Sequence, residues 1–213
     1  MTHIRRSEKV LIMKRLLLIL ILTLSFQSWT KADDIRDFEI EGMSIGDSIL
    51  DFFNEKKILK NKVDWYDNRE KNRYLSFAFG ENTFEKYDYV DVFTEHDDKK
   101  YKIKSVAGSI YFGKDKDFND IADCYIKQKE IADQIYKMFS NIEREGPAKH
   151  IHVADKTGDS TYTDIYFIFK NNYDITISCY DWSKSFEEER YRKDHFSIFI
   201  RSDKMSNWLD NIN

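Results

Sequence analysis

The chain has few of the residues that interrupt regular structure. It contains one proline and seven glycines among 213 residues. A proline-rich or glycine-rich linker between separate domains is therefore excluded. We predict a single α+β domain over residues 33–213, which could also consist of two fused halves at about residues 33–116 and 117–213.

The chain also lacks the short motifs of several enzyme classes. It has no Gly-x-Ser-x-Gly elbow, no phosphate-binding glycine loop and no Cys-x-x-Cys pair. We therefore predict a non-enzymatic binding or interaction protein without an organic cofactor. Its partner, a protein or a small ligand, is not identified by the sequence.

Long hydrophobic runs are absent apart from one near the N-terminus. The run from Leu16 to Phe26 has eleven residues, whereas a helix needs about twenty to cross a membrane. Lys14-Arg15 precedes the run, and Thr30-Lys31-Ala32 offers the small residues of a cleavage site. We predict a signal peptide over residues 1–32, a periplasmic or secreted mature protein, and no stable transmembrane span after cleavage. A permanent membrane anchor is the alternative.

The predicted mature chain has an excess of acidic residues. The full chain has a formal net charge of −4, and residues 1–32 contain six basic residues and one acidic residue, so the remainder carries −9. A negative charge of this size opposes nonspecific binding to nucleic acid or anionic lipid. We predict no nucleic-acid partner.

Cysteine is scarce as well. Cys124 and Cys179 are the two cysteines of the chain, and both follow the predicted leader. An isolated pair in an exported protein indicates a disulfide. We predict a Cys124–Cys179 bond, with two separate buried thiols as the alternative.

The clearest periodic pattern in the chain predicts a long helix over Asp117–Ile142. Apolar residues recur there at steps of three and four, which is typical of one buried helix face. Asp117 can cap the first turn, and Gly146-Pro147 can stop the helix. The predicted buried stripe is Phe118, Ile121, Tyr125, Gln128, Ala132, Ile135, Phe139 and Ile142.

Strand-like segments precede and follow this helix. Their alternation of apolar and polar residues predicts an α+β fold in which helices cover one face of an antiparallel sheet or sheets, in the order α-βββ-α-βββ-α. The predicted strands are Tyr74–Phe79, Tyr87–Thr94, Tyr101–Phe112, Tyr162–Lys170, Tyr173–Tyr180 and Phe196–Ile200.

A two-residue turn at Asn171-Asn172 predicts the register of one hairpin. If Lys170 opposes Tyr173, then Asp164 opposes Cys179, and Tyr166 lies with Ile177 on the face toward the long helix. The other face then carries a possible partner surface, unless the first half of the chain covers it. The residues of that surface are Ile165, Phe167 and Phe169.

One cluster suggests a metal site. His150 and His152 are one residue apart and project to the same side of an extended segment, and Asp155 follows. Imidazole and carboxylate both suit zinc, so a metal-dependent hydrolase using His150 and His152 is the alternative function. The simpler interpretation is a polar surface loop between the helix and the hairpin.

Two segments carry a resemblance to known proteins. The stretch ADDIRDFEIEGMSIGDS and the later CYDWS look like an uncharacterised family of small exported bacterial proteins, which implies no activity. More weakly, the glycine-methionine turn into a helix is similar to BamE/SmpA-like and β-lactamase-inhibitor-like αβββ modules. That resemblance implies a secreted interaction domain.

Overall fold

The computed structural model describes residues 34–64, 73–80, 83–113, 117–190 and 193–212. The chain divides into two units, Met1–Lys31 and Ala32–Asn213, and all described residues belong to the second. The predicted signal peptide lies outside the described residues.

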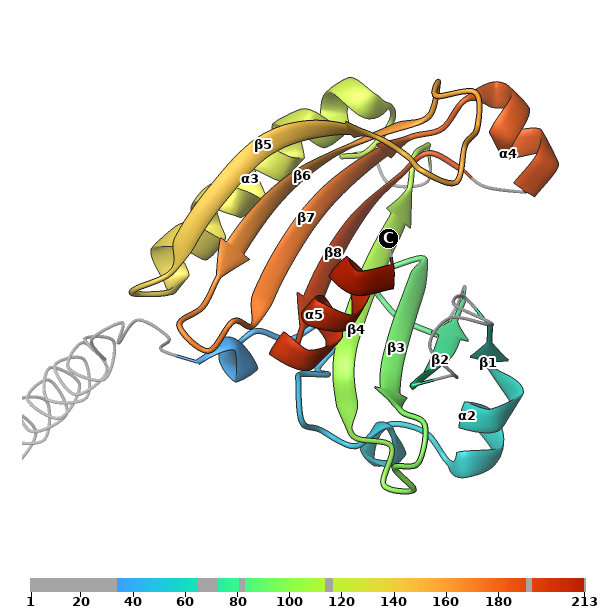
Figure 1. Ribbon diagram of the computed structural model, residues 1–213, viewed down its shortest axis with the longest axis vertical. Coiled ribbons are helices and arrows are strands. Elements are labelled where there is room, and N and C mark those ends of the chain that lie inside the picture. The colour runs from blue at the N-terminus through green and yellow to red at the C-terminus, as the bar shows by residue number, and fades with distance from the viewer. Residues whose placement is uncertain (1–33, 65–72, 81–82, 114–116, 191–192, 213) are drawn as a thin grey trace, which may run out of the picture. The chain divides into compact units, whose positions relative to one another are not determined.

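The described strands form one antiparallel sheet of eight strands, in the order β1-β2-β3-β4-β8-β7-β6-β5. β8 lies between β4 and β7, so that Ile200 opposes both Val106 and Ile175. The strands before and after the long helix are thereby joined in one sheet (Figure 1). The strands are β1 (Lys62–Val63), β2 (Tyr74–Phe79), β3 (Tyr89–Glu95), β4 (Ile103–Tyr111), β5 (Glu143–Ile151), β6 (Thr161–Ile168), β7 (Asp174–Asp181) and β8 (His195–Arg201).

Helical segments lie before, between and after these strands. The α+β class and the antiparallel sheet are confirmed, but the predicted order is not, because α4 separates β7 from β8. The segments are η1 (Ile35–Asp37), η2 (Ile49–Asp51), α2 (Glu55–Lys60), α3 (Ile121–Met138), α4 (Lys184–Arg190) and α5 (Asp203–Ile212).

The long helix α3 is shorter than predicted at both ends. Asp120, rather than Asp117, caps it, because the Asp120 carboxylate accepts hydrogen bonds from two backbone N–H groups of the first turn at 2.9 and 3.0 Å. The helix ends at Met138, and Asn141 then takes a left-handed conformation with a φ of 60°. The prediction that Gly146-Pro147 ends the helix is wrong, because both residues lie within β5.

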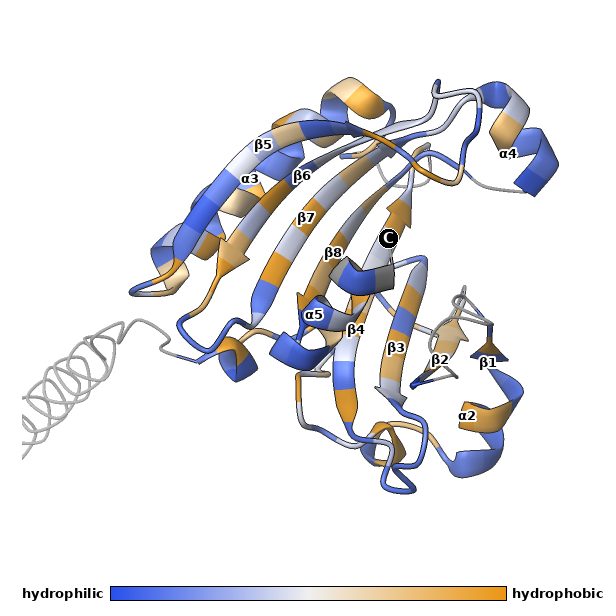
Figure 2. Ribbon diagram, in the orientation of Figure 1, coloured by the Kyte–Doolittle hydropathy of each residue, from blue (hydrophilic) through white to orange (hydrophobic). Residues whose placement is uncertain are grey.

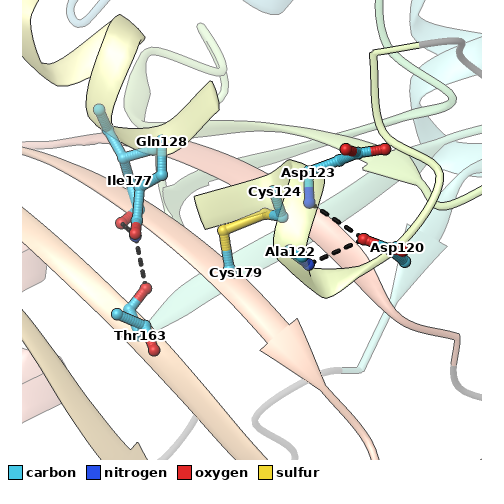
Figure 3. Close-up of a disulfide and its surroundings, with 8 residues drawn as sticks. All are labelled: Asp120, Ala122, Asp123, Cys124, Gln128, Thr163, Ile177 and Cys179. Carbon is cyan, nitrogen blue, oxygen red and sulfur yellow. Dashed lines mark hydrogen bonds between the residues drawn. A yellow bond between two sulfur atoms is a disulfide. The ribbon is translucent and has the colours of Figure 1, made fainter. Parts of the chain in front are cut away.

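The buried side of α3 follows the predicted stripe and is fixed to the sheet. Cys124 is bonded to Cys179 of β7 with Cα atoms 6.0 Å apart, so the predicted disulfide is confirmed (Figure 3). One turn further on, the Gln128 amide donates hydrogen bonds to the main-chain oxygens of Thr163 at 2.6 Å and Ile177 at 2.8 Å. The buried residues within α3 are Cys124, Gln128, Ala132 and Ile135.

The two faces of the sheet are packed differently. The face toward α3, which we call the core face, forms one hydrophobic core with α3 and with the segment that contains η1, η2 and α2. On the opposite face, which we call the open face, α5 packs over β2 and β3, where the rings of Trp208 and Tyr74 have centroids 5.1 Å apart. Figure 1 shows α3 behind the sheet and α5 in front of it. The prediction that the helices cover one face is therefore wrong.

The hairpin of β6 and β7 contains the predicted strands joined by a longer turn. The Phe169 N–H donates to the Tyr173 oxygen at 2.9 Å, and the Asn172 N–H donates to the Phe169 oxygen at 2.8 Å. Residues 170–172 thus form the turn, and Asn172 takes a φ of 58°. One additional turn residue shifts the pairing of the strands by one position.

This shift exchanges the two faces of β6, whereas the side chains of β7 keep the predicted faces. Ile177 opposes Ile165 rather than Tyr166. Ile165, Phe167 and Phe169 have exposed fractions of 2%, 0% and 6%, and they belong to the hydrophobic core that includes α3. The prediction of a partner surface at these residues is wrong, because they are core residues.

β5 occupies a stretch that the simpler interpretation assigned to a loop. It pairs with β6 at one edge of the sheet. Most of its side chains are exposed, and Figure 2 shows that it lacks the hydrophobic bands seen along β7. A bulge interrupts the pairing between Glu145 and Ala148, where Gly146 and Pro147 are inserted.

Candidate functional site

A row of ring side chains crosses the open face from β4 to β5. Successive members oppose one another in the registers of four neighbouring strand pairs. Four of them are partly exposed, and His150 at the edge is exposed. We call this set the ring row; its members are Tyr111, His195, Tyr180, Tyr162 and His150.

Four rings of this row, from His150 to His195, stack on one another, whereas Tyr111 meets His195 edge to face at 5.9 Å and 70°. Ring centroids are 5.1 Å apart for His150 and Tyr162, 5.6 Å for Tyr162 and Tyr180, and 4.5 Å for Tyr180 and His195, with interplanar angles of 30° or less. Strand side chains stand roughly perpendicular to the sheet. The stacked rings therefore present their edges on the side away from the sheet, although Nδ1 of His195 is engaged with the main-chain oxygen of Lys193 at 2.7 Å.

Trp182 extends the aromatic cluster beyond the end of β7. Its ring lies 5.6 Å from that of Tyr180, 4.5 Å from that of His152 and 5.1 Å from that of Phe186 on α4. The cluster thus contacts the connection that follows β5 and the helix that precedes β8. Contact between aromatic pairs of this kind stabilises by about 0.5–1.5 kcal/mol beyond the burial of area.

A second row, of small and polar side chains, lies beside the ring row. Ser109, Ser197, Ser178 and Asp164 oppose one another in order across β4, β8, β7 and β6. The Ser109 and Ser197 hydroxyl oxygens are 2.7 Å apart and form a hydrogen bond. The row therefore places hydroxyl groups and one carboxylate next to the ring row.

Asp164 is the unusual member of the second row. It is 3% exposed, and its Oδ2 accepts a hydrogen bond from the Tyr166 hydroxyl at 2.8 Å. Its Oδ1 is buried and has no hydrogen-bond partner among the described residues. Burial raises the pKa of Asp164, while the nearby Ser178 and Tyr166 hydroxyls and the charge of His150 oppose the increase. Burial and the Asp164 carboxylate also raise the pKa of Tyr166.

A buried carboxylate of this kind is a common feature of functional sites. Buried polar atoms are nearly always hydrogen-bonded, so an unpartnered carboxylate oxygen calls for a physical explanation. Ionisable groups with shifted pKa values also concentrate at binding and catalytic sites. The ring row and Asp164 together are therefore our candidate site.

The predicted metal ligands do not form one site. His150 and His152 do lie on the same side, because both contact Tyr162, with ring centroids 5.1 and 5.7 Å away. Asp155, however, is occupied elsewhere by hydrogen bonds from Ser160 and Ser183. Within the part of the chain that the structure describes, no three His, Cys, Asp or Glu residues are grouped to hold a metal ion.

Asp155 instead organises the connection between β5 and β6. Its carboxylate accepts hydrogen bonds from the Ser160 hydroxyl at 2.5 Å, the Thr157 hydroxyl at 2.7 Å and the Ser183 hydroxyl at 2.9 Å. The Ser160 and Thr157 hydroxyls hold the pKa of Asp155 well below its ordinary value, against the effect of burial.

The residue pattern along β6 could have indicated Asp164 as a site residue, but the predicted register was wrong. Tyr162, Asp164 and Tyr166 alternate with buried residues along β6, which is the pattern of a polar and aromatic face. The predicted register placed Asp164 opposite Cys179, whereas it opposes Ser178. A correct turn length would have placed Asp164 beside the serines.

Comparisons of the chain with protein-family models, with curated proteins and with solved structures found no match. The resemblances stated from the sequence remain predictions. None of the helices in the described ranges combines the length and the apolar character needed to cross a membrane. The function is therefore inferred from the geometry of the open face.

Proposed function

We propose that this protein is an exported, non-enzymatic binding protein whose ligand contacts the open face at the ring row and Asp164. One observation carries the proposal. A continuous row of partly exposed rings across five strands lies next to a buried carboxylate with an unpartnered oxygen.

The position of the rings supports a binding role over a packing role. The main hydrophobic core lies on the other face of the sheet, and the ring row is not part of it. Tyrosine and histidine combine an apolar body with a polar tip and lose little rotamer freedom on binding. Such side chains can provide both contact area and hydrogen bonds to a ligand.

The disulfide supports export. Cys124 and Cys179 are bonded, and no free cysteine is present in the described residues. Disulfides of this kind form and persist in oxidising compartments such as the periplasm or the medium. The predicted leader at residues 1–32 would deliver the chain there.

The binding role can be tested with ring-row variants. Purified protein is mixed with an extract of the culture medium and cell envelope, and the retained compounds are identified by mass spectrometry and titrated calorimetrically. We expect Tyr162→Ala with Tyr180→Ala to weaken binding of a retained compound by about tenfold or more, because two aromatic contacts are lost.

A matched control is available on the helix. Tyr136 on α3 is 50% exposed, so Tyr136→Ala removes a tyrosine that is more exposed than Tyr162 and Tyr180 and lies outside the ring row. We expect this variant to bind as the unmodified protein does, and thermal unfolding confirms that each variant is folded. Equal binding by the ring-row variant and the unmodified protein, or retention of no compound, would refute the proposal.

A further inference from the structure

We infer that the ligand carries a primary ammonium group that donates a hydrogen bond to Oδ1 of Asp164. This inference rests on the proposed binding function and names the chemical class of its ligand. Three sets of observations support it: the hydrogen-bond partners of the other buried carboxylates, the residues around Asp164, and the charges on the open face.

Three aspartates are buried within the described residues, and two of them have their carboxylates fully engaged. Asp155 accepts hydrogen bonds from three hydroxyl groups. Asp174 is paired with Arg201, whose guanidinium donates at 2.9 and 2.6 Å, and it also accepts from Ser206 of α5. Asp164 alone of the three has a buried oxygen without a partner.

The neighbours of Asp164 leave its Oδ1 without a partner. The hydroxyl groups of Ser109 and Ser197 are hydrogen-bonded to each other. The Ser178 hydroxyl lowers the pKa of Asp164 by hydrogen bonding to its side chain, yet Oδ1 remains buried and unpartnered. A buried carboxylate oxygen is stabilised most by a charged donor, since such hydrogen bonds are about twice as strong as neutral ones.

The surroundings favour a slender cation over a bulky one. Tyr162 and Tyr166 precede and follow Asp164 on the same face of β6, and both rings are partly exposed. A primary ammonium on an alkyl chain is narrow, so it requires a smaller displacement of these rings to reach Oδ1 than a bulky cation does. The electron-rich ring faces would then attract the same positive charge.

The charges on the open face also favour a cationic ligand. Glu145 of β5 is exposed and opposes Tyr166, two residues from Asp164 on the same face of β6. Arg201, on the same face, is paired with Asp174, and Lys193 lies at the far end of the ring row, 5.9 Å from the centroid of the Tyr111 ring. The negative charges of Asp164 and Glu145 therefore favour a cation over an anion at this end of the face.

Titration calorimetry at neutral pH can test this inference with defined probes. The probes are putrescine, 1,4-butanediol, which has hydroxyl groups in place of both ammonium groups, and tetramethylammonium, which is a cation without N–H donors. We expect saturable putrescine binding, no butanediol binding, and binding of tetramethylammonium that is at least about tenfold weaker.

Variants locate the contact. Asp164→Asn is expected to weaken putrescine binding by about tenfold or more, whereas Asp159→Asn, at an exposed aspartate on the connection between β5 and β6, is expected to leave it unchanged. Tyr166→Phe removes the hydroxyl that occupies Oδ2 and is expected to tighten binding. This variant decides the question if Asp164→Asn does not fold.

Several results would overturn the inference. These are the absence of putrescine binding, tetramethylammonium binding as tight as that of putrescine, unchanged affinity in Asp164→Asn, or weaker binding in Tyr166→Phe. If any of these occurs while the ring-row variants still lose the compound retained from the extract, the ammonium inference fails and the binding function stands. If the ring-row variants also retain that compound, both proposals fail.

Discussion

Asp155 shows at the scale of one residue how a carboxylate can be structural rather than functional. Its oxygens accept hydrogen bonds from Ser160, Thr157 and Ser183, residues that lie on both sides of the hairpin formed by β6 and β7. The sequence indicated a metal ligand because an aspartate near two histidines has the right chemistry. Donors from hydroxyl and backbone groups satisfy the same oxygens equally well.

The depressed pKa of Asp155 predicts acid-sensitive stability. The pKa of Asp155 is lower in the folded protein than in the unfolded chain. At pH values above about 3.9, the ordinary pKa of Asp, the ionised carboxylate therefore contributes its full stabilisation to the fold. This stabilisation is lost as the pH falls below that value toward the lower pKa of the folded protein. We expect the unfolding temperature of Asp155→Asn to depend less on pH than that of the unmodified protein between about pH 5 and about pH 2.

Thermal unfolding followed by circular dichroism measures this difference. Asp159→Asn serves as the control, because Asp159 lies in the same connection and is exposed; its curve is expected to follow that of the unmodified protein. Parallel pH dependences for Asp155→Asn and the unmodified protein would show that the Asp155 hydrogen bonds do not contribute as the structure indicates.

Among the elements, the alternation of apolar and polar residues predicted the strands well, but it did not predict the length of the turn between them. β2 coincides with the predicted Tyr74–Phe79, because one of its faces is in the core and the pattern is strong. The hairpin register was wrong by one position, because asparagine tolerates a left-handed conformation in turns of two or three residues alike. The positive φ of Asn172 is common to both possibilities.

β5 could not be predicted from alternation, since neither of its faces is buried. Its side chains are mostly exposed, and its pairing with β6 depends on main-chain hydrogen bonds that the residue pattern does not reveal. The glycine and proline in its middle indicated a helix stop, whereas they form a bulge at the edge of the sheet. Proline is tolerated at this position because edge strands and bulges have unpaired main-chain groups.

The bulge makes Gly146 sensitive to substitution. Its φ is +89°, and a Cβ atom built there would lie 2.5 Å from the main-chain oxygen of Asp164. We expect Gly146→Ala to lower the free energy of unfolding by about 1–3 kcal/mol, because the backbone of β5 must move away from β6. Urea unfolding measures this loss.

Gly158 provides the matched control for this prediction. Its φ is +80°, but a Cβ atom there would meet nothing within 4 Å. Gly158→Ala therefore has the cost of the left-handed conformation without the close contact. The difference between the two losses in the free energy of unfolding measures the contribution of the close contact between β5 and β6. Equal losses in the two variants would contradict the prediction for Gly146.

At the scale of the whole molecule, the sequence predicted the class of fold but not the way in which its parts join. Strands on either side of α3 were predicted as separate groups because each group is consecutive along the chain. The last strand, β8, is inserted between β4 and β7 and connects them. Nothing in the alternation of Phe196, Ile198 and Ile200 distinguishes a central strand from an edge strand, since the partners of a strand are set by tertiary packing.

The same insertion accounts for the candidate site. The ring row exists because Tyr111 from the first group of strands and Tyr180 from the second both oppose His195 of β8. A site whose residues come from five strands is visible only after the strand order is known. The sequence alone therefore indicated the pair His150 and His152 and could not indicate the row.

The disulfide gives the last prediction, which concerns the stability of the whole molecule. The Cys124–Cys179 bond joins α3 to β7 across a sequence separation of 55 residues and is fully buried. By restricting the unfolded chain, such a bond stabilises by about 2–4 kcal/mol. We expect Cys124→Ala with Cys179→Ala to lower the free energy of unfolding by this amount, measured by urea unfolding.

Reduction of the unmodified protein separates the covalent bond from the packing of its sulfur atoms. Reduced protein keeps both sulfurs in the core but lacks the crosslink, so under dithiothreitol it is expected to lose most of the stability that the double variant loses. The double variant should not respond to dithiothreitol, because the chain contains no further cysteine. If reduction leaves the urea midpoint of the unmodified protein unchanged, the crosslink contributes nothing to stability, and the attachment of α3 to the sheet depends on packing and on the Gln128 hydrogen bonds alone.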